Sequence, residues 1–325
     1  MDALTPQEID KAHERIFSLI IKTPLISSET INKKTNANVY FKLENLQWTG
    51  SFKLRGASNK ISQLSNEEKS RGIVSYSSGN HAQAVAYASN LIGVQATIIM
   101  PKNAPSIKIK NTKKYGADVV LYDSMHESRE KIALEIAHKE NKTIVKPYDD
   151  LDVIAGQGTV GKEIAEELKL QNIHPDIFLC CCGGGGLIAG SSTYLKHAFP
   201  NIKNFAVEPE EFNDTQLSLK NNSIVKNKES GKSICDALLA PQPGDVTFPV
   251  NQTTLDGGLA VSDKEVKKTI IELAEDMKIV VEPGGSVAAT ALLTNKISVK
   301  NKNVVVMISG GNIDYKLFSS IVRNC

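Results

Sequence analysis

Short apolar segments alternate with amphipathic segments along almost the whole chain, and this alternation limits the possible folds more than any other feature. Strands are expected at 39–43, 73–76, 96–100, 119–122, 177–182, 205–207 and 304–308. Helices are expected at 80–91, 107–115, 126–139, 158–170 and 264–277. The alternation predicts βαβ units, and therefore an α/β fold with mainly parallel sheets covered on both faces.

The strands are too many for one open sheet of usual size, and residues 72–145 contain four strand–helix repeats of their own. Two α/β domains are therefore predicted. The Lys/Asn-rich segment 220–232 is expected to be a solvated surface excursion.

The charge balance argues against nucleic acid as a partner. The 325 residues include 38 Lys+Arg and 36 Asp+Glu, which gives a net charge of +2, and the basic residues are scattered. There is no apolar run of the roughly 18 residues that span a bilayer, and the amino terminus has no signal pattern. A cytoplasmic enzyme without a membrane partner is expected. Cys180, Cys181 and Cys182 lack zinc-site spacing and are expected to be small buried side chains.

Four glycines, Gly183, Gly184, Gly185 and Gly186, lie between a predicted strand and a predicted helix. Ligands of parallel α/β sheets bind beyond the carboxyl ends of strands. Backbone N–H groups without neighbouring Cβ atoms can converge on an anion there, and the helix amino terminus attracts it. The segment therefore favours a phosphate site, although a tight strand–helix turn is the alternative. Neither a P-loop nor a G-x-G-x-x-G order is present, which argues against ATP and NAD.

Other polar segments follow predicted strands at 77–81, which includes Ser77, Asn80 and His81, and at 309–312, which begins with Ser309. The first is either a carboxylate site or only a helix cap. Lys53 lies in the Gly/Ser-rich segment 49–56. Most such lysines are surface residues, but beside a phosphate site this one is a candidate for imine formation with a phosphorylated aldehyde cofactor.

These segments together resemble a known family. The ordered motifs 51–56, 77–81, 183–186 and 309–312 are similar to those of fold type II pyridoxal-phosphate enzymes, the tryptophan synthase β-subunit-like fold. The serine/threonine dehydratase and serine racemase branch is the most similar, and the resemblance runs from about residue 23 to residue 312. It implies a discontinuous cofactor domain at 1–68 and 150–325, with a small substrate domain at 69–149.

The resemblance implies a role for each matched residue. Lys53, after Phe52 in the cofactor site, would bind pyridoxal 5'-phosphate and remove the substrate Cα proton. Asn80 would contact the ring hydroxyl, residues 183–186 the phosphate, and Ser309 the pyridine nitrogen. A neutral hydroxyl at that nitrogen favours loss of a β-leaving group. The substrate α-carboxylate would bind Ser77, Asn80 and His81.

Two further residues bear on the reaction and on the substrate. Ser78 matches the second base of the racemases, although many dehydratases share this motif. Arg129 could bind a second substrate carboxylate by a bidentate contact, as the similarity of 128–130 to serine racemases and 3-hydroxyaspartate dehydratases suggests, or it could lie on a solvated helix face. The resemblance also implies a small amino-acid substrate and a homodimer.

Residues 208–214 resemble the divalent-cation site of this branch. Glu208, Asp214 and the Phe212 carbonyl would suit Mg²⁺ or Ca²⁺, and an acidic helix start is the alternative. The chain stops soon after Asn312, so the family's regulatory domain is not expected, nor is control by isoleucine or valine. The expected activity is the conversion of L-threonine or L-serine to a 2-oxo acid and ammonia. A 3-hydroxyaspartate dehydratase, a serine racemase and a cofactor-binding protein without catalysis are the alternatives.

Overall fold

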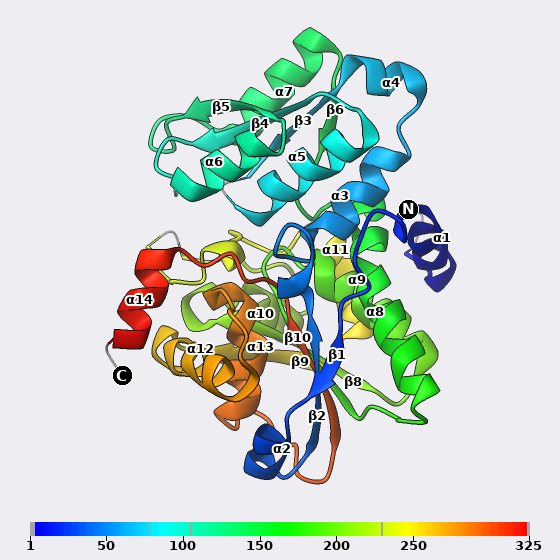
Figure 1. Cartoon of the computed structure of the whole chain (residues 1–325), viewed down its shortest axis with the longest axis vertical. Helices are drawn as coiled ribbons and strands as arrows, with labels where there is room; N and C mark the ends of the chain where they lie inside the picture. The colour runs from blue at the N-terminus through cyan, green and yellow to red at the C-terminus, as the bar shows by residue number, and fades with distance from the viewer. Residues whose placement is uncertain (1–3, 78, 105, 229, 324–325) are drawn as a thin grey trace.

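The computed structural model describes residues 4–323 except 78, 105 and 229. Two sheets form the framework, a six-stranded sheet below a four-stranded sheet in Figure 1. All neighbouring strands are parallel except β1 and β2. The predicted α/β fold with two mainly parallel sheets is therefore confirmed.

The six-stranded sheet has the order β1-β2-β10-β7-β8-β9. Its strands are β1 (Leu25–Ser27), β2 (Asn38–Leu43), β7 (Ile177–Cys181), β8 (Lys203–Pro209), β9 (Gly257–Val261) and β10 (Asn303–Ile308). Its main helices are α8 (Leu151–Leu170), α9 (Gly186–Ala198), α12 (Asp263–Met277) and α13 (Pro283–Leu293). Figure 1 shows α8 and α9 on one side of the sheet and α12 and α13 on the other, so both faces are covered.

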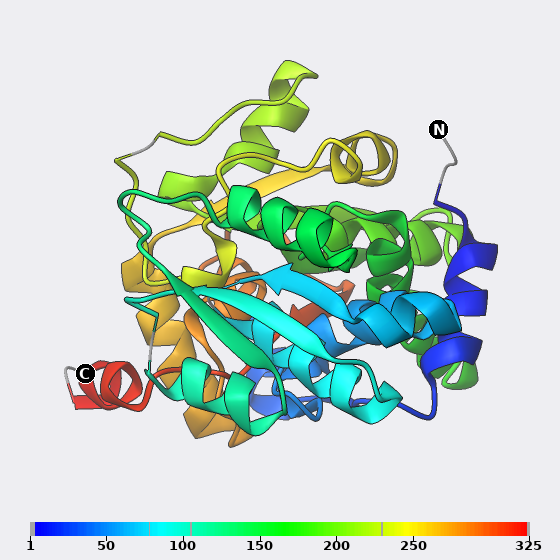
Figure 2. The same cartoon turned by 90° about the horizontal axis from the view of Figure 1, so that it is seen from above.

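The four-stranded sheet has the order β5-β4-β3-β6 and comes entirely from residues 73–145. Its strands are β3 (Ile73–Tyr76), β4 (Ala96–Pro101), β5 (Asp118–Tyr122) and β6 (Thr143–Val145), and its helices are α5 (Asn80–Ile92), α6 (Ser106–Lys114) and α7 (Arg129–Glu140). Alternate strand residues pack on opposite faces, because Ile73 and Ile98 belong to one apolar cluster while Val74 and Ile99 belong to another. Figure 2 shows this sheet from above.

The remaining elements connect or cover the sheets. They are α1 (Pro6–Ile16), α2 (Glu29–Thr35), the 3₁₀ turn η1 (Glu44–Leu46), α3 (Lys53–Ser62), α4 (Asn66–Arg71), η2 (Glu210–Phe212), α10 (Asp214–Asn221), η3 (Asp236–Leu238), α11 (Thr247–Thr254) and α14 (Tyr315–Arg323). Within the described part of the chain, every helix is too short or too polar to cross a membrane.

One predicted helix boundary needs correction. The predicted helix 158–170 begins earlier, at Leu151, because the Asp150 carboxylate accepts hydrogen bonds from the amides of Asp152 and Val153. The segment 220–232 is mostly exposed, but Asn227 turns inward and donates to Asp214 Oδ1 and to the Ala240 carbonyl. The expectation of buried cysteines is confirmed for Cys180, Cys181 and Cys182.

Candidate active site

The loop that carries Lys53 is attached to the end of β10. The Phe52 amide donates to the Ser309 carbonyl at 3.1 Å, and the Gly311 amide donates to the Gly50 carbonyl at 2.9 Å. Gly50 has a φ of +72°, a conformation that favours glycine. Two motifs about 250 residues apart in the sequence thus meet at the carboxyl edge of the six-stranded sheet, where ligands of parallel sheets bind.

The Lys53 amine is enclosed. Its Nζ donates to the Pro147 carbonyl at 2.7 Å. Burial lowers the pKa of Lys53 to about 8, because the charged ammonium loses its hydration. Lys53 therefore holds a larger fraction of nucleophilic free amine near neutral pH than an exposed lysine does.

The four glycines form the turn between β7 and α9. A Cβ on Gly184 would lie 2.3 Å from the Tyr148 ring, and Gly185 has a φ of +92°. The Thr247 hydroxyl donates to the Gly184 carbonyl at 2.7 Å. Among the described residues, the N–H groups at 183–185 donate to no protein acceptor. Free amides at the amino terminus of a helix suit a phosphate, so this turn fits the phosphate of pyridoxal phosphate.

Asn80 begins α5 and is part of a buried amide network. Its Nδ2 donates to Glu282 Oε1 at 2.5 Å, and its Oδ1 accepts from Asn312 Nδ2 at 2.8 Å. Asn312 also donates to the Thr49 carbonyl at 2.8 Å. The Asn312–Asn80 hydrogen bond joins the predicted segments 77–81 and 309–312 directly, and Glu282 is bound to the same network through Asn80.

His81 is neutral. Burial, with the nearby charge of Lys53, lowers the pKa of His81 to about 3. Its Nε2 lies 3.2 Å from the Val145 carbonyl. Since a carbonyl only accepts, the single proton of the neutral ring lies on Nε2, and Nδ1 has no partner among the described residues. In this form the free ring nitrogen of His81, Nδ1, can accept a hydrogen bond but cannot donate one.

Arg129 is the first residue of α7 and also reaches the pocket. Its guanidinium lies 5.6 Å from the centre of the Tyr76 ring, and its Nε donates to Glu130 Oε1 at 2.8 Å. Its side chain remains 36% exposed. Arg129 lies at the solvated start of a helix and also lines the cavity, and its contact with a second substrate carboxylate stays a prediction.

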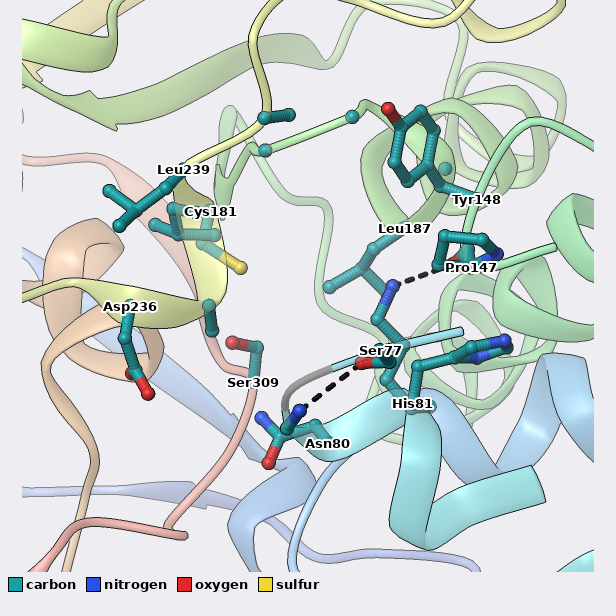
Figure 3. A pocket seen from close by; sticks show the side chains of 18 of the residues that line it. Ser77, Asn80, His81, Pro147, Tyr148, Cys181, Leu187, Asp236, Leu239 and Ser309 are labelled. Carbon is teal, nitrogen blue, oxygen red and sulfur yellow. Dashed lines mark hydrogen bonds between the residues drawn. The ribbon is translucent and has the colours of Figure 1, made fainter. Parts of the chain in front are cut away.

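One cavity collects most of these side chains. It is lined by the predicted residues Phe52, Lys53, Ser77, Asn80, His81, Arg129, Gly183, Gly184, Gly185, Gly186 and Ser309. Figure 3 shows Ser309 and Cys181 on one side of it and His81 and Pro147 on the other. Ser78, the predicted second base, lies outside the described residues.

Several lining residues were missed by the sequence analysis. Glu282 occupies the N-cap position of α13, without a side-chain capping hydrogen bond, and is buried. Burial raises the pKa of Glu282 to about 7, and the Lys108 charge opposes this rise. Lys108, Tyr148 and Asp236 also line the cavity. They lie on helices or loops without a motif. Tyr148 and Lys108 come after the strands β6 and β4, whereas Asp236 lies far from the preceding strand β8 in the sequence and has no such signal.

Glu208 and Asp214 lie together beneath the end of β8. Glu208 accepts from the amides of Thr215 and Gln216 at 2.9 and 2.8 Å. Burial and the Asp214 charge raise the pKa of Glu208, and burial raises the pKa of Asp214 to about 7. Asp214 Oδ2 is buried without a partner in the described structure.

This pair fits a hard cation in its chemistry, because two buried carboxylates lack a balancing positive charge. Phe212 lies in the turn η2, between Glu208 and Asp214 in the sequence, so its carbonyl is a possible third ligand. The described residues contain no group of three or more His, Cys, Asp or Glu side chains that could hold a metal. Any cation would therefore need carbonyl or water ligands.

Known proteins resemble the whole chain. Residues 16–310 match the family model described as pyridoxal-phosphate dependent enzyme. A serine racemase of Schizosaccharomyces pombe is 42% identical over 97% of this chain and 96% of its own. An L-threo-3-hydroxyaspartate ammonia-lyase of Saccharomyces cerevisiae is 40% identical over 96% and 94% of the two chains.

A solved structure agrees with the sequence matches. The serine racemase of Dictyostelium discoideum has a TM-score of 0.89 at 39% identity, and the match covers 96% of this chain and 99% of that one. The family match takes in the Lys53 loop, the glycine turn and Ser309, which the fold brings to one cavity. The chain therefore belongs to the family of pyridoxal-phosphate-dependent enzymes.

Proposed function

We propose that this enzyme is a β-hydroxy-amino-acid ammonia-lyase that converts L-threonine or L-serine to a 2-oxo acid and ammonia. The observation that carries the proposal is the enclosed Lys53 amine in a cavity that also presents the glycine turn and the Ser309 hydroxyl. We further propose that residues 69–149 form a substrate domain and that residues 1–68 and 150–325 form the cofactor domain. The cavity is lined from both parts.

We assign separate roles in cofactor binding, proton transfer and substrate binding to the residues of the cavity. Residues 183–186 would hold the phosphate, Ser309 would contact the pyridine nitrogen, and Phe52 and Asn80 would complete the cofactor site. When bound, pyridoxal phosphate withdraws electrons from the substrate Cα and makes its proton acidic. Lys53 accepts this proton, because its lowered pKa leaves part of the amine unprotonated. Ser77, Asn80 and His81 surround the α-carboxylate, and His81 in its neutral form contributes shape rather than charge.

Two alternatives remain open within the same site. Arg129 in the cavity wall supports a substrate with a second carboxylate, such as 3-hydroxyaspartate, since guanidinium groups bind carboxylates in bidentate fashion. Racemisation of serine would use Ser78 as a second base opposite Lys53. The support for it is the similarity to a serine racemase.

A substrate panel tests the proposal. The purified holoenzyme is incubated with L-threonine, L-serine and L-threo-3-hydroxyaspartate, and both the 2-oxo acid and the chirality of the remaining amino acid are measured. We expect 2-oxo acid from L-threonine or L-serine. D-serine without 2-oxo acid would instead identify a racemase, and 2-oxo acid from 3-hydroxyaspartate alone would identify the dicarboxylate lyase.

A lysine variant assigns the activity to this site. Lys53→Ala is expected to lose both turnover and the visible absorbance of the lysine-bound cofactor, because no amine remains to bind the aldehyde. Lys11→Ala serves as the matched control, since Lys11 lies exposed on α1 and pairs only with Glu8 among the described residues. Persistent absorbance and turnover in Lys53→Ala would refute the assignment.

We also propose a Mg²⁺ or Ca²⁺ site at Glu208, Asp214 and the Phe212 carbonyl, and a homodimer as the working assembly. The unpartnered Asp214 oxygen supports the first. Exposed apolar side chains at Leu46, Trp48 and Val280 support the second.

A further inference from the structure

An ion pair joins the two sides of the candidate active site. Lys108 lies on α6, beside the four-stranded sheet, and Asp236 lies in η3, within the part that carries the six-stranded sheet. Lys108 Nζ lies 2.5 Å from Asp236 Oδ2, and both residues line the cavity. Figure 3 shows the Asp236 side chain on the cavity wall that also carries Ser309.

The two partners differ in exposure. Lys108 is 5% exposed, whereas the Asp236 side chain is 49% exposed. An ammonium has three donors, and among the described residues Lys108 donates a hydrogen bond only to Asp236. The cation is thus buried, while its anion is accessible to solvent.

The ammonium lies beside the loop proposed for the α-carboxylate. A Cβ on Gly79 would lie 3.4 Å from Lys108 Nζ, and the Lys108 charge acts on buried Glu282. That loop itself has no positive charge. Among its described residues, the polar side chains are Ser77, Asn80 and neutral His81. An incoming carboxylate would therefore meet the remaining ammonium donors of Lys108 beside this loop.

We propose that Lys108 is a further substrate-binding residue, which attracts the α-carboxylate of the amino acid, and that this carboxylate displaces Asp236. The inference rests on the proposed use of residues 77–81 for the carboxylate. Asp236 then balances the buried charge in the empty site. The exchange gives the enzyme a charge-based selection for amino acids over simple amines.

Two variants distinguish this role from a structural bridge, because they break the same ion pair from opposite sides. If the pair only holds the two parts together, Lys108→Met and Asp236→Asn should change ligand affinity in the same direction. If Lys108 binds the carboxylate, Lys108→Met removes the cation, whereas Asp236→Asn removes its competitor. The two variants should then have opposite effects.

The experiment measures binding rather than turnover. Holoenzyme is titrated with glycine and with methylamine, which lacks only the carboxylate, and the change in visible cofactor absorbance gives each Kd. Glycine has no β-leaving group and cannot be deaminated by elimination. We expect Lys108→Met to raise the glycine Kd about ten-fold or more, the usual size of a lost charge-assisted hydrogen bond. Asp236→Asn should lower it, and neither variant should alter the methylamine Kd.

Lys108→Arg keeps the positive charge and should stay closer to the wild type than Lys108→Met does. Shifts of the glycine Kd in the same direction in Lys108→Met and Asp236→Asn, or equal shifts for glycine and methylamine, would overturn the inference. If Lys108→Met does not fold, Asp236→Asn decides alone: a lower glycine Kd supports the proposal and an unchanged or higher one refutes it. A wild-type holoenzyme that responds to neither ligand would instead refute the proposed site as a whole.

Discussion

The lowered pKa of Lys53 gives a prediction about cofactor loading. Only the free amine attacks an aldehyde, and Lys53 has a pKa of about 8 because of burial. The rate at which the apoprotein takes up pyridoxal phosphate should therefore rise with pH and level off above about 8. For an exposed lysine, the rate would continue to rise until the pH reaches about 10.4. Stopped-flow absorbance after mixing measures this rate.

The control for this experiment is Lys53→Ala, whose slow absorbance change reports reaction at other lysines and is subtracted. A pH midpoint near the value of exposed lysines would contradict the burial of the amine.

The carboxylates of Glu208 and Asp214 give a second prediction at the residue scale. The folded-state pKa of Asp214, about 7, lies above its unfolded value, so its contribution to stability is present at low pH and lost as the pH rises through about 7. A divalent cation binds the deprotonated carboxylates. The gain in Tm on adding Mg²⁺ or Ca²⁺ should therefore be larger at pH 8 than at pH 5.5.

Thermal melts with chelator and with each cation at the two pH values measure this gain. Asp214→Asn should lose it, whereas Glu210→Gln, which changes the neighbouring acidic residue outside the pair, should keep it. An equal gain at both pH values, or in Asp214→Asn, would argue against a cation at this pair.

Individual residues were predictable where a motif marks them. The glycine run, Lys53 and Ser309 each stand in a distinctive local pattern, and the fold brings them to one cavity. The proton position on His81 and the ion pair of Lys108 were not predictable, because each depends on a partner far away in the sequence: Val145 for His81 and Asp236 for Lys108. The proton position on His81 and the ion pair of Lys108 both depend on burial, which is a property of the folded structure.

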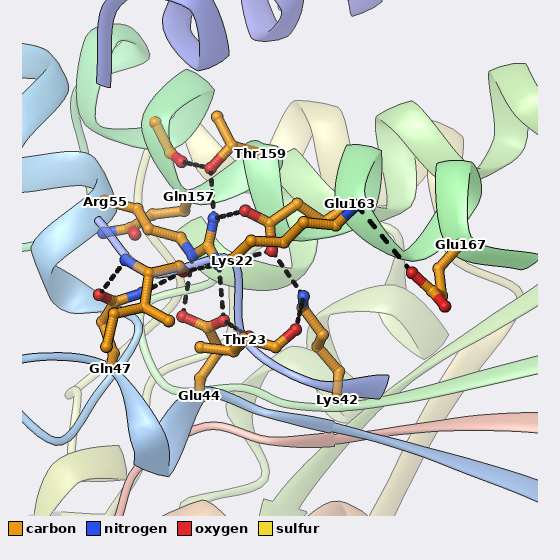
Figure 4. Close-up of polar contacts among 12 residues, drawn as sticks. Lys22, Thr23, Lys42, Glu44, Gln47, Arg55, Gln157, Thr159, Glu163 and Glu167 are labelled. Atoms are coloured by element: carbon orange, nitrogen blue, oxygen red, sulfur yellow. Dashed lines mark hydrogen bonds and ion pairs between the residues drawn. The ribbon is translucent and has the colours of Figure 1, made fainter. Parts of the chain in front are cut away.

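At the scale of elements, a buried ionic network joins β2, η1, α3 and α8 (Figure 4). Arg55 donates to Glu44 at 2.8 Å and to Glu163 at 2.7 Å, and Lys42 donates to Glu163 at 2.5 Å. Two cations thus balance two anions with almost no exposure. The network fixes α3, the helix that begins at Lys53.

Removing one charge from this network should be costly. Glu163→Gln leaves two buried cations against one anion and should lower the free energy of unfolding by about 3–5 kcal/mol. Urea denaturation measures the change. The matched control on the same helix is Glu167→Gln, whose pair with Lys22 spans 4.0 Å near the surface and should cost less than about 1 kcal/mol. Similar small shifts in both variants would contradict the importance of the network.

Elements were predictable where their apolar pattern is strong. The strands at 73–76 and 304–308 were expected almost as they occur, since their residues are mostly apolar and are buried in the sheets. Helix α13 was missed because it is built from small residues and is buried on all sides, so it has no polar face to give a helical period. Strand β9 was missed because it begins with two glycines.

For the whole molecule, the exposed apolar residues near the Lys53 loop give a prediction about assembly. Leu46, Trp48 and Val280 are 46, 59 and 49% exposed, and Asn45 donates to the Val280 carbonyl, which brings the segments together. A homodimer that buries them should have twice the 35.3 kDa chain mass in sedimentation experiments. Dilution should shift the emission of Trp48, the single tryptophan, to longer wavelength.

Trp48→Glu should raise the dissociation constant of this dimer by about ten-fold or more, since it places a charge in an apolar contact. Leu170→Glu, which changes an 81% exposed residue at the end of α8, should have no effect. A wild-type chain that sediments as a monomer, or equal dissociation of the two variants, would show that these side chains do not form the interface.

The position of β10 has a consequence for the synthesis of the protein. This last strand lies between β2 and β7, so the six-stranded sheet stays divided until residues 303–308 arrive. The Lys53 loop then gains its contacts with Ser309 and Gly311. Because such long-range pairing forms late and slowly, a nascent chain has no complete cofactor site until residues 303–311 have been synthesised. Chains cut short before β10 should therefore fail to bind pyridoxal phosphate.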